Sequence, residues 1–433
     1  MKKLAVFCAL ALGVLTAGAY AESILIKGGK VHTLADMGSL ESADVLVVDG
    51  KVEQVAPVLN VSADRVIDAK GKVVTPGVIA PISELGLVEI SAASGTNDNA
   101  VTGESIGSAF NPVPAYNPKS TLIPFNRAGG VTSAVVFPAI STWDETAVAA
   151  QRVFAGRGFA IKLNGEFNSV EAKDVAQKAY LGETGAQLAG GSRANAYAKV
   201  ENALSEAKEY RDNRAAIRRG EWRELNYSLA DLEALQPVIN GTEPLLITAD
   251  RASDILAVIE LAKAFDVKLV LLGAAEGWMV ADQLAQAQVP VVIDAINNLP
   301  ISFSSLGARL DNAALLTRAG VKVAISGPDY ASTHNVYLSR QSAGNAVAHG
   351  LPYEEALKSI STNVADIFRL SGGTLEKGAT ADIVVWNGDP LEVTSYPEQV
   401  LIEGEPQSLV TRSTRLRDRH LKPAKGHGFG YRN

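Results

Sequence analysis

Short apolar segments separated by turn residues fill the chain between residues 22 and 78. Apolar runs at 24–26, 45–48 and 51–55 have the length of β-strands, and Asp49-Gly50 lies between the last two. An Asp-Gly pair between two β-branched runs is a strong hairpin signal, because both residues readily adopt positive φ. The pattern predicts that residues 22–78 form part of a small antiparallel β-domain.

From about residue 79 the pattern changes to apolar strands that alternate with amphipathic helices. Strands are expected at 132–137, 158–163, 245–248, 268–272, 289–293 and 321–326, and helices at 252–265, 278–287 and 313–319. Alternation over this length predicts an α/β domain with a parallel sheet, and its size suits a TIM (β/α)8 barrel over residues 79–370. The charged segment 200–235 is expected to be an exposed helical insertion.

Strand patterns return after a helix that is expected over residues 352–370. Segments 381–386, 399–402 and 408–411 have strand character, so both chain ends supply β-structure. We expect residues 22–78 and 371–433 to meet in one composite β-sandwich beside the barrel. The last part includes a basic stretch over residues 412–425 with six cations and one acid, which is either solvated or faces an acidic partner. These residues are Arg412, Arg415, Arg417, Arg419, Lys422 and Lys425, against Asp418.

The first 21 residues have the features of a secretory signal peptide. Lys2 and Lys3 precede an apolar run at 4–15, and small residues lead to a cleavage site after Ala21. We therefore expect a periplasmic or secreted protein. The single cysteine, Cys8, lies inside this segment, so the mature chain is expected to lack disulfides and cysteine-ligated zinc. No later apolar stretch has the roughly 18 residues that a membrane span needs.

The composition favours a small-molecule ligand or a protein partner. The chain has 433 residues with 47 acidic and 40 basic side chains, a net charge of −7, which gives no global reason to bind nucleic acid. A hydrophobic content of 47% is that of a folded protein. Self-association into a homo-oligomer is compatible with the sequence, which does not fix the oligomeric state.

Three motifs give the chain a family resemblance. They are GKVVTPGVI at 71–79, STNVA at 361–365 and GATADIVVW at 378–386. In this order and at this separation they resemble the amidohydrolase superfamily, and within it the exported imidazolonepropionase-like group. The resemblance implies a TIM barrel with a flanking β-domain, zinc or another divalent metal, and hydrolysis of non-peptide C–N bonds in cyclic amides or dipeptide-like substrates.

The metal ligands that this resemblance implies are replaced. The family's first barrel strand continues into Asp-x-His-x-His, which puts two imidazoles on one face of the strand. In this chain Ile82 and Glu84 occupy the two histidine positions. Thr248 stands where a later strand has its ligand histidine, and Gly273 stands where the next strand has its own. We therefore expect no cofactor here, although the family would use a divalent metal.

The remaining candidates are mainly charged residues. Asp329, after the last expected barrel strand, stands near the family's catalytic aspartate and is the candidate catalytic residue. The candidate substrate pocket consists of Glu84, Lys162, Glu166, Asp250, Arg251 and His334. Its carboxylates either hold Mg²⁺ or Ca²⁺ through oxygen atoms or form ordinary salt bridges, with Arg251 as a natural partner. The other histidines, His32, His349, His420 and His427, are not expected at barrel strand ends.

Two functional hypotheses follow from these residues. In the first, the protein is a degenerate amidohydrolase, a pseudoenzyme that serves as a binding module or as the non-catalytic partner of an intact amidohydrolase paralogue. In the second, it is an active metal-dependent hydrolase with a reduced site centred on Asp329, which Lys162 or Glu84 assists. The loss of ligands at three separate strands favours the first hypothesis.

Overall fold

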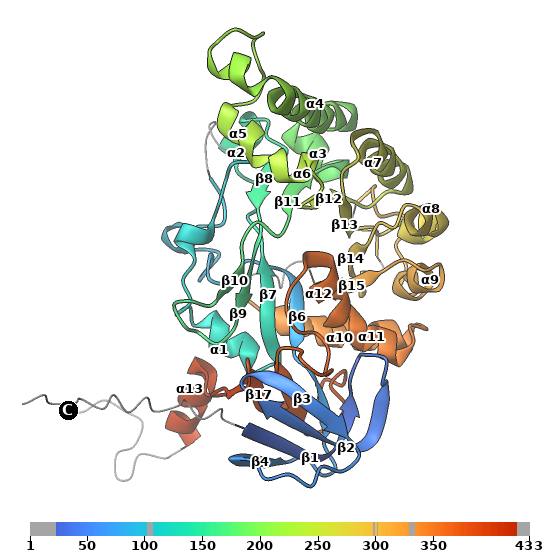
Figure 1. Cartoon of the computed structure of the whole chain (residues 1–433). Helices are drawn as coiled ribbons and strands as arrows, with labels where there is room; N and C mark the ends of the chain where they lie inside the picture. The colour runs from blue at the N-terminus through green and yellow to red at the C-terminus, as the bar shows by residue number, and fades with distance from the viewer. Residues whose placement is uncertain (1–22, 102–106, 298, 301, 329–333, 422–433) are drawn as a thin grey trace, which may run out of the picture.

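The computed structural model describes residues 23–101, 107–297, 299–300, 302–328 and 334–421 (Figure 1). These residues form a mixed α/β structure with a β-domain, drawn in blue and red at the bottom of Figure 1, and a larger α/β part above it. Asp329 and the signal segment, both singled out from the sequence, lie outside the described residues.

Both ends of the chain supply strands to the β-domain. Its eight-stranded sheet has the order β18-β17-β16-β5-β1-β2-β3, with β4 beside β1. The strands are β1 (Ser23–His32), β2 (Ser39–Val48), β3 (Lys51–Ala56), β4 (Arg65–Asp68), β5 (Val73–Pro76), β16 (Ile383–Trp386), β17 (Pro397–Ile402) and β18 (Glu405–Pro406). The two ends join where β16 pairs antiparallel with β5. A two-sheet sandwich stays a prediction.

The turn between β2 and β3 has the conformation that its sequence predicts. Asp49 and Gly50 have φ of 52° and 71°, and Val48 lies opposite Lys51 in the ladder. Positive φ at both central residues is the geometry of a two-residue hairpin turn that follows the twist of the strands. This hairpin places Val45, Val47 and Val52 in the apolar core of the β-domain.

The larger part contains two hydrogen-bonded sheets, with orders β10-β9-β7-β6 and β15-β14-β13-β12-β11-β8. The strands are β6 (Val78–Ser83), β7 (Val131–Val136), β8 (Phe154–Arg157), β9 (Phe159–Lys162), β10 (Val170–Ala172), β11 (Gln177–Tyr180), β12 (Leu245–Ala249), β13 (Leu269–Gly273), β14 (Val291–Asp294) and β15 (Val323–Ser326). Neighbours from β11 to β15 are parallel, as are β6 and β7.

The described residues do not form a closed barrel. β9 runs antiparallel to β7, and β8 runs antiparallel to β11, so the stretch from Phe154 to Lys162 has the opposite direction to its neighbours. β15 and β6 contact each other, but no ladder joins them in the described part of the chain. The prediction of a mixed α/β domain is confirmed, whereas the closed, all-parallel barrel is not observed.

Helices cover the outer side of the six-stranded sheet (Figure 1). They include α3 (Gly182–Leu188), α4 (Arg193–Arg218), α5 (Leu229–Ala234), α6 (Gln236–Ile239), α7 (Ala252–Phe265), α8 (Ala281–Gln286) and α9 (Asn312–Arg318). Leu245 and Ile247 pack on the helix side of β12, while Leu246 packs in a second apolar cluster on the other side. A parallel strand buried on both faces is therefore apolar at consecutive positions.

The remaining helices differ in part from the sequence prediction. They are α1 (Leu122–Arg127), α2 (Glu145–Ala149), α10 (Ser339–Ala348), α11 (Tyr353–Ser359), α12 (Thr362–Phe368) and α13 (Arg412–Leu421). The predicted helix over 352–370 is interrupted at Ser361, which has φ of −145° and ψ of −94°. Residues 408–411 form no strand and lead directly into α13. The charged insertion is only partly exposed, because one face of α4 buries Val200, Leu204 and Tyr210.

No helix in the described ranges is both long enough and apolar enough to cross a bilayer.

Candidate functional site

The carboxyl ends of the parallel strands define the candidate site, since ligands of parallel α/β folds bind there. Glu84 follows β6, Asp250 and Arg251 follow β12, and Gly273 ends β13. The structure thus places these four positions at or just after the carboxyl end of a strand. Their side-chain contacts decide what chemistry the site can perform.

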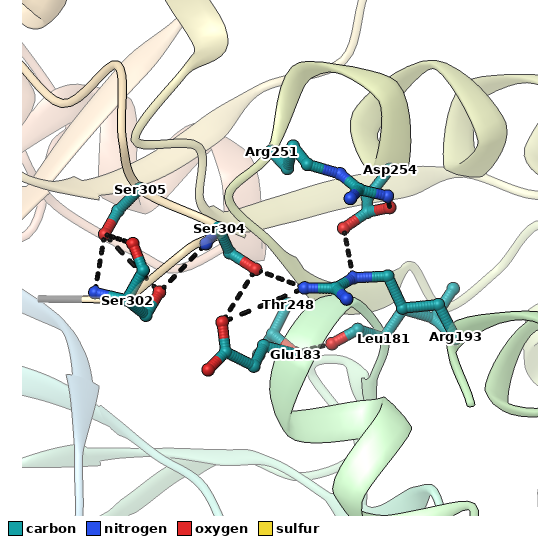
Figure 2. Close-up of polar contacts among 9 residues, drawn as sticks. All are labelled: Leu181, Glu183, Arg193, Thr248, Arg251, Asp254, Ser302, Ser304 and Ser305. Carbon is teal, nitrogen blue, oxygen red and sulfur yellow. Dashed lines mark hydrogen bonds and ion pairs between the residues drawn. The ribbon is translucent and has the colours of Figure 1, made fainter. Parts of the chain in front are cut away.

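A polar network ties the rim of this site together (Figure 2). Arg193, the first residue of α4, donates from Nε to Asp254 Oδ2 at 3.1 Å and from Nη2 to Ser304 Oγ at 2.7 Å. Ser304 in turn donates to Glu183 Oε2 at 3.0 Å. Arg251 donates to the other oxygen of Asp254 at 2.8 Å. The network fastens the loop after β14 to the helices that follow β11 and β12.

Thr248 and Gly273, which end or nearly end β12 and β13, both contact neighbouring polar groups. Thr248 Oγ1 donates to Leu181 O at 3.4 Å. Gly273 has φ of +105°, and a Cβ at this position would lie 2.5 Å from Asp250 Oδ1. That carboxylate oxygen accepts a hydrogen bond from Ala275 N at 3.2 Å. Any side chain at position 273, histidine included, would have to displace Asp250.

The two positions on β6 are also occupied by other interactions. Ile82 is half-buried and packs against the apolar cluster between the strands. Glu84 is half-buried, and its Oε1 accepts a hydrogen bond from Asn99 Nδ2 at 2.8 Å. Ile82 offers no donor atom, so the paired ligands of a His-x-His strand are absent from these residues.

A divalent metal of the family type does not fit the residues described. Structural and catalytic zinc sites use three or more nitrogen, sulfur or carboxylate ligands. Among the described residues no group of three or more His, Cys, Asp and Glu side chains is arranged to hold a metal ion. Ile82 and Gly273 contribute no ligand atom, and Asp250 Oδ1 already accepts a backbone N–H. We therefore derive no reaction step through a metal.

Lys162 and Glu166 lie at the opposite end of the sheet, which corrects their assignment to the substrate pocket. Because β9 is antiparallel to β7, Lys162 pairs with Ser133 near the start of β7, not with Val136 at its end. Glu166 is exposed and follows β9 at this same end. The sequence pattern of a strand does not carry its direction, so the prediction put both residues at the wrong end.

Lys162 is the centre of a buried ion triad that joins the two parts of the molecule. Its Nζ lies 2.6 Å from Asp382 Oδ2 and 3.2 Å from Glu171 Oε2, and the residue is 3% exposed. Burial alone would lower the pKa of Lys162, but the two carboxylates outweigh burial and raise that pKa. Burial raises the pKa of Asp382, which Lys162 opposes. The triad thus links β9 to the residue that precedes β16 in the β-domain.

His334 lies beside α1, where its carbonyl oxygen accepts a hydrogen bond from Asn126 Nδ2 at 2.8 Å.

Lys178, which the sequence analysis did not identify as a candidate, lies on β11 and is 7% exposed. Its Nζ donates to Pro138 O at 3.2 Å and lies 5.1 Å from the centre of the Tyr180 ring. The short segment Gln177–Tyr180 has no apolar run, so the strand and its inward lysine escaped the hydrophobic pattern. The alternation of Lys178 and Tyr180, two residues apart, was the one pattern in this segment that could have indicated a strand.

Comparisons with known proteins find similarity to amidohydrolases. Residues 246–406 match the sequence model of the Amidohydrolase family. Amidohydrolase tasK of Hapsidospora irregularis is 23% identical over 402 residues, which are 84% of this chain but 40% of the relative. The chain thus spans less than half of that relative's length.

Solved structures agree with the sequence matches. An amidohydrolase from Thermotoga maritima MSB8 has a TM-score of 0.76 at 25% identity, over 88% of this chain and 99% of that chain. An adenosine deaminase from Xanthomonas campestris, solved with bound zinc, shares the fold with a TM-score of 0.53 at 14% identity, over 92% of this chain and 97% of that chain. Part of the chain, residues 246–406, thus matches the Amidohydrolase family, and the fold is similar to that of a solved amidohydrolase.

Proposed function

We propose that this protein is a degenerate amidohydrolase, which binds a small molecule or an intact amidohydrolase paralogue and no longer catalyses metal-dependent hydrolysis of C–N bonds. The observation that carries the proposal is the contact at the end of β13. Gly273 has a backbone conformation that disfavours side chains, and the Asp250 carboxylate fills the space that a histidine would need. Family ancestry is retained in the scaffold, while the strand ends have taken on packing and capping roles.

The length of amidohydrolase tasK supports the partner role. The region that matches this chain makes up 40% of amidohydrolase tasK, so that polypeptide has room for a second domain of similar size. In such a two-domain chain, a degenerate domain could lie beside an active one. The equivalent arrangement here would be a complex of this protein with a separate, active paralogue. The rim network of Arg193, Glu183 and Ser304 would then hold a binding surface in place.

We also propose that the protein is exported. Lys2, Lys3, the apolar run and Ala21 support this proposal. In a bacterial host the mature protein is expected in the periplasmic or secreted fraction, beginning at Glu22, and amino-terminal sequencing checks the start. An intact Met1 on the purified protein would contradict export.

Metal content and turnover test the degenerate site. After growth with added zinc and manganese, the purified protein is expected to contain less than about 0.1 metal ion per chain, because the remaining donor atoms are too few for tight binding. Elemental analysis measures the metal. A panel of cyclic amides and dipeptides measures hydrolysis, with an intact amidohydrolase prepared in parallel as the positive control.

The competing hypothesis makes the opposite prediction. If the chain holds nearly one metal ion and hydrolyses a panel member, and Asp329→Asn abolishes that turnover, the protein is an active hydrolase with a reduced site. An Asp366→Asn variant is the matched control, because Asp366 forms an exposed ion pair with Lys322 away from the strand ends. Turnover without a response to Asp329→Asn would also overturn the proposal.

A further inference from the structure

A cavity of about 360 Å³ lies between α1, the residues after β9 and the start of α13. Four cationic side chains line it, together with a single acid. The cations are Lys119, Arg127, Arg412 and Arg415, and the acid is Glu166. A hollow with such an excess of positive charge attracts anions, because the protein walls concentrate its field.

Arg127 forms the fixed part of this cavity. Arg127 is 8% exposed, and its guanidinium donates hydrogen bonds to backbone carbonyls. Nη1 donates to Leu163 O and Asn164 O at 2.8 and 3.0 Å, while Nε and Nη2 donate to Ser408 O at 3.2 and 3.1 Å. Burial lowers the pKa of Arg127, and among the described residues no carboxylate forms an ion pair with its guanidinium.

The other three cations that line the cavity are exposed, in contrast to Arg127. Lys119 Nζ donates to Gly165 O at 2.6 Å, which again pairs a cation with a neutral carbonyl. Arg412 and Arg415 are three residues apart on α13, so they lie on one side of the helix, and both are exposed. None of these three side chains lies within 4.0 Å of a carboxylate in the described part of the chain.

The cavity is separate from the strand-end site. Leu163 N donates to Thr132 O at the start of β7, so the residues after β9 lie at the amino end of that strand. The helix α13, which contributes Arg412 and Arg415 to the cavity lining, is the described part of the basic tail (Figure 1). Arg412 and Arg415, the first two arginines of the tail, therefore line the same cavity as the buried Arg127.

We propose that this cavity is a binding site for a small multivalent oxyanion, such as a phosphate group. Guanidinium groups match the oxygen geometry of phosphate and carboxylate through paired N–H donors. Four cations against one acid favour an anion with more than one negative charge. Arg127 is held by carbonyls before any ligand binds, so little ordering is needed at the floor of the site.

Calorimetric titration of the full chain with inorganic phosphate at low ionic strength tests the site. Phosphate is expected to bind, and Arg412→Ala/Arg415→Ala is expected to weaken binding at least about tenfold, since two charge-assisted hydrogen bonds are lost. Glu166→Gln is expected to tighten binding about threefold, because a like charge leaves the cavity. Both sites are exposed, so the fold is expected to be unaffected, and thermal unfolding confirms this.

A matched control uses the same helix and the same change in charge. Arg417→Ala/Arg419→Ala lies outside the cavity lining and is expected to change the phosphate affinity less than about twofold. Equal weakening by both double variants would mean a diffuse field and would overturn the site. Absence of phosphate binding would also overturn it. Citrate and acetate form further arms of the titration, and acetate binding as tightly as phosphate would refute the preference for multivalent anions.

Discussion

Replacing Lys162 by methionine is expected to lower the free energy of unfolding by about 3–5 kcal/mol. The change removes the only cation of the triad and leaves Asp382 Oδ2 and Glu171 Oε2 buried without their partner. Removing one member of a buried ion pair is costly because the remaining charge keeps its desolvation penalty. Urea unfolding of the wild type and the variant measures the difference.

Two further variants separate this effect from the loss of a side chain. Lys162→Met/Asp382→Asn is expected to recover part of the stability, because it also removes the buried negative charge nearest to the lysine. Lys377→Met breaks an exposed pair with Glu53 and is expected to cost less than about 1 kcal/mol. If Lys162→Met costs no more than Lys377→Met, the triad does not stabilise the junction between the two parts.

Glu243→Gln is expected to stabilise the protein at alkaline pH. Glu243 is 2% exposed, and both of its carboxylate oxygens are buried without a hydrogen-bond partner in the described structure. Burial raises the pKa of Glu243 to about 8, the nearby Asp174 adds to the rise, and Arg157 opposes it. The folded protein therefore keeps this side chain protonated at neutral pH.

The sign of the pH dependence follows from that raised pKa. Between about pH 4.5 and pH 8 the folded state binds more protons than the unfolded state, so the stability falls as the pH rises. The rise in the pKa of Glu243 from 4.5 to about 8 corresponds to a loss of at most about 5 kcal/mol in the free energy of unfolding above pH 8. Glutamine has no charge to lose, so the gain from Glu243→Gln is expected to grow from pH 5 to pH 9.

Denaturant unfolding at pH 5, 7 and 9 measures this trend. Glu221→Gln serves as the control, because Glu221 is exposed and pairs only with Arg219 at the surface. The control is expected to show no comparable change with pH. A constant difference between Glu243→Gln and the wild type across this range would show that Glu243 is ionised in the folded state at all three pH values.

The sequence predicted the elements with a clear hydrophobic period. The helix expected over 252–265 has these bounds in the structure, because its apolar positions recur at the helical period and Asp266 ends it with φ of 56°. The hairpin at Asp49-Gly50 and the strands at the centre of the parallel sheet are confirmed for the same reason. Local patterns decide local structure when tertiary packing agrees with them.

The site could be predicted only in part, because its geometry depends on contacts between distant segments. The sequence shows a glycine at position 273, but it does not show that the Asp250 carboxylate lies where a side chain at this position would begin. Because β9 runs antiparallel to β7, Lys162 and Glu166 lie away from Glu84. The spacing of residues in the sequence does not indicate the direction in which a strand runs. Asp329 as a catalytic residue stays a prediction.

The pairing of β5 with β16 sets the order in which a newly made chain can finish its β-domain. Trp386 donates from Nε1 to Thr75 Oγ1, a residue 311 positions earlier in the chain. Until Trp386 has left the ribosome, β5 presents unpaired backbone groups along an open edge, which is a template for aggregation. Contacts of such long range form slowly, so the first strands to be synthesised are among the last to be completed.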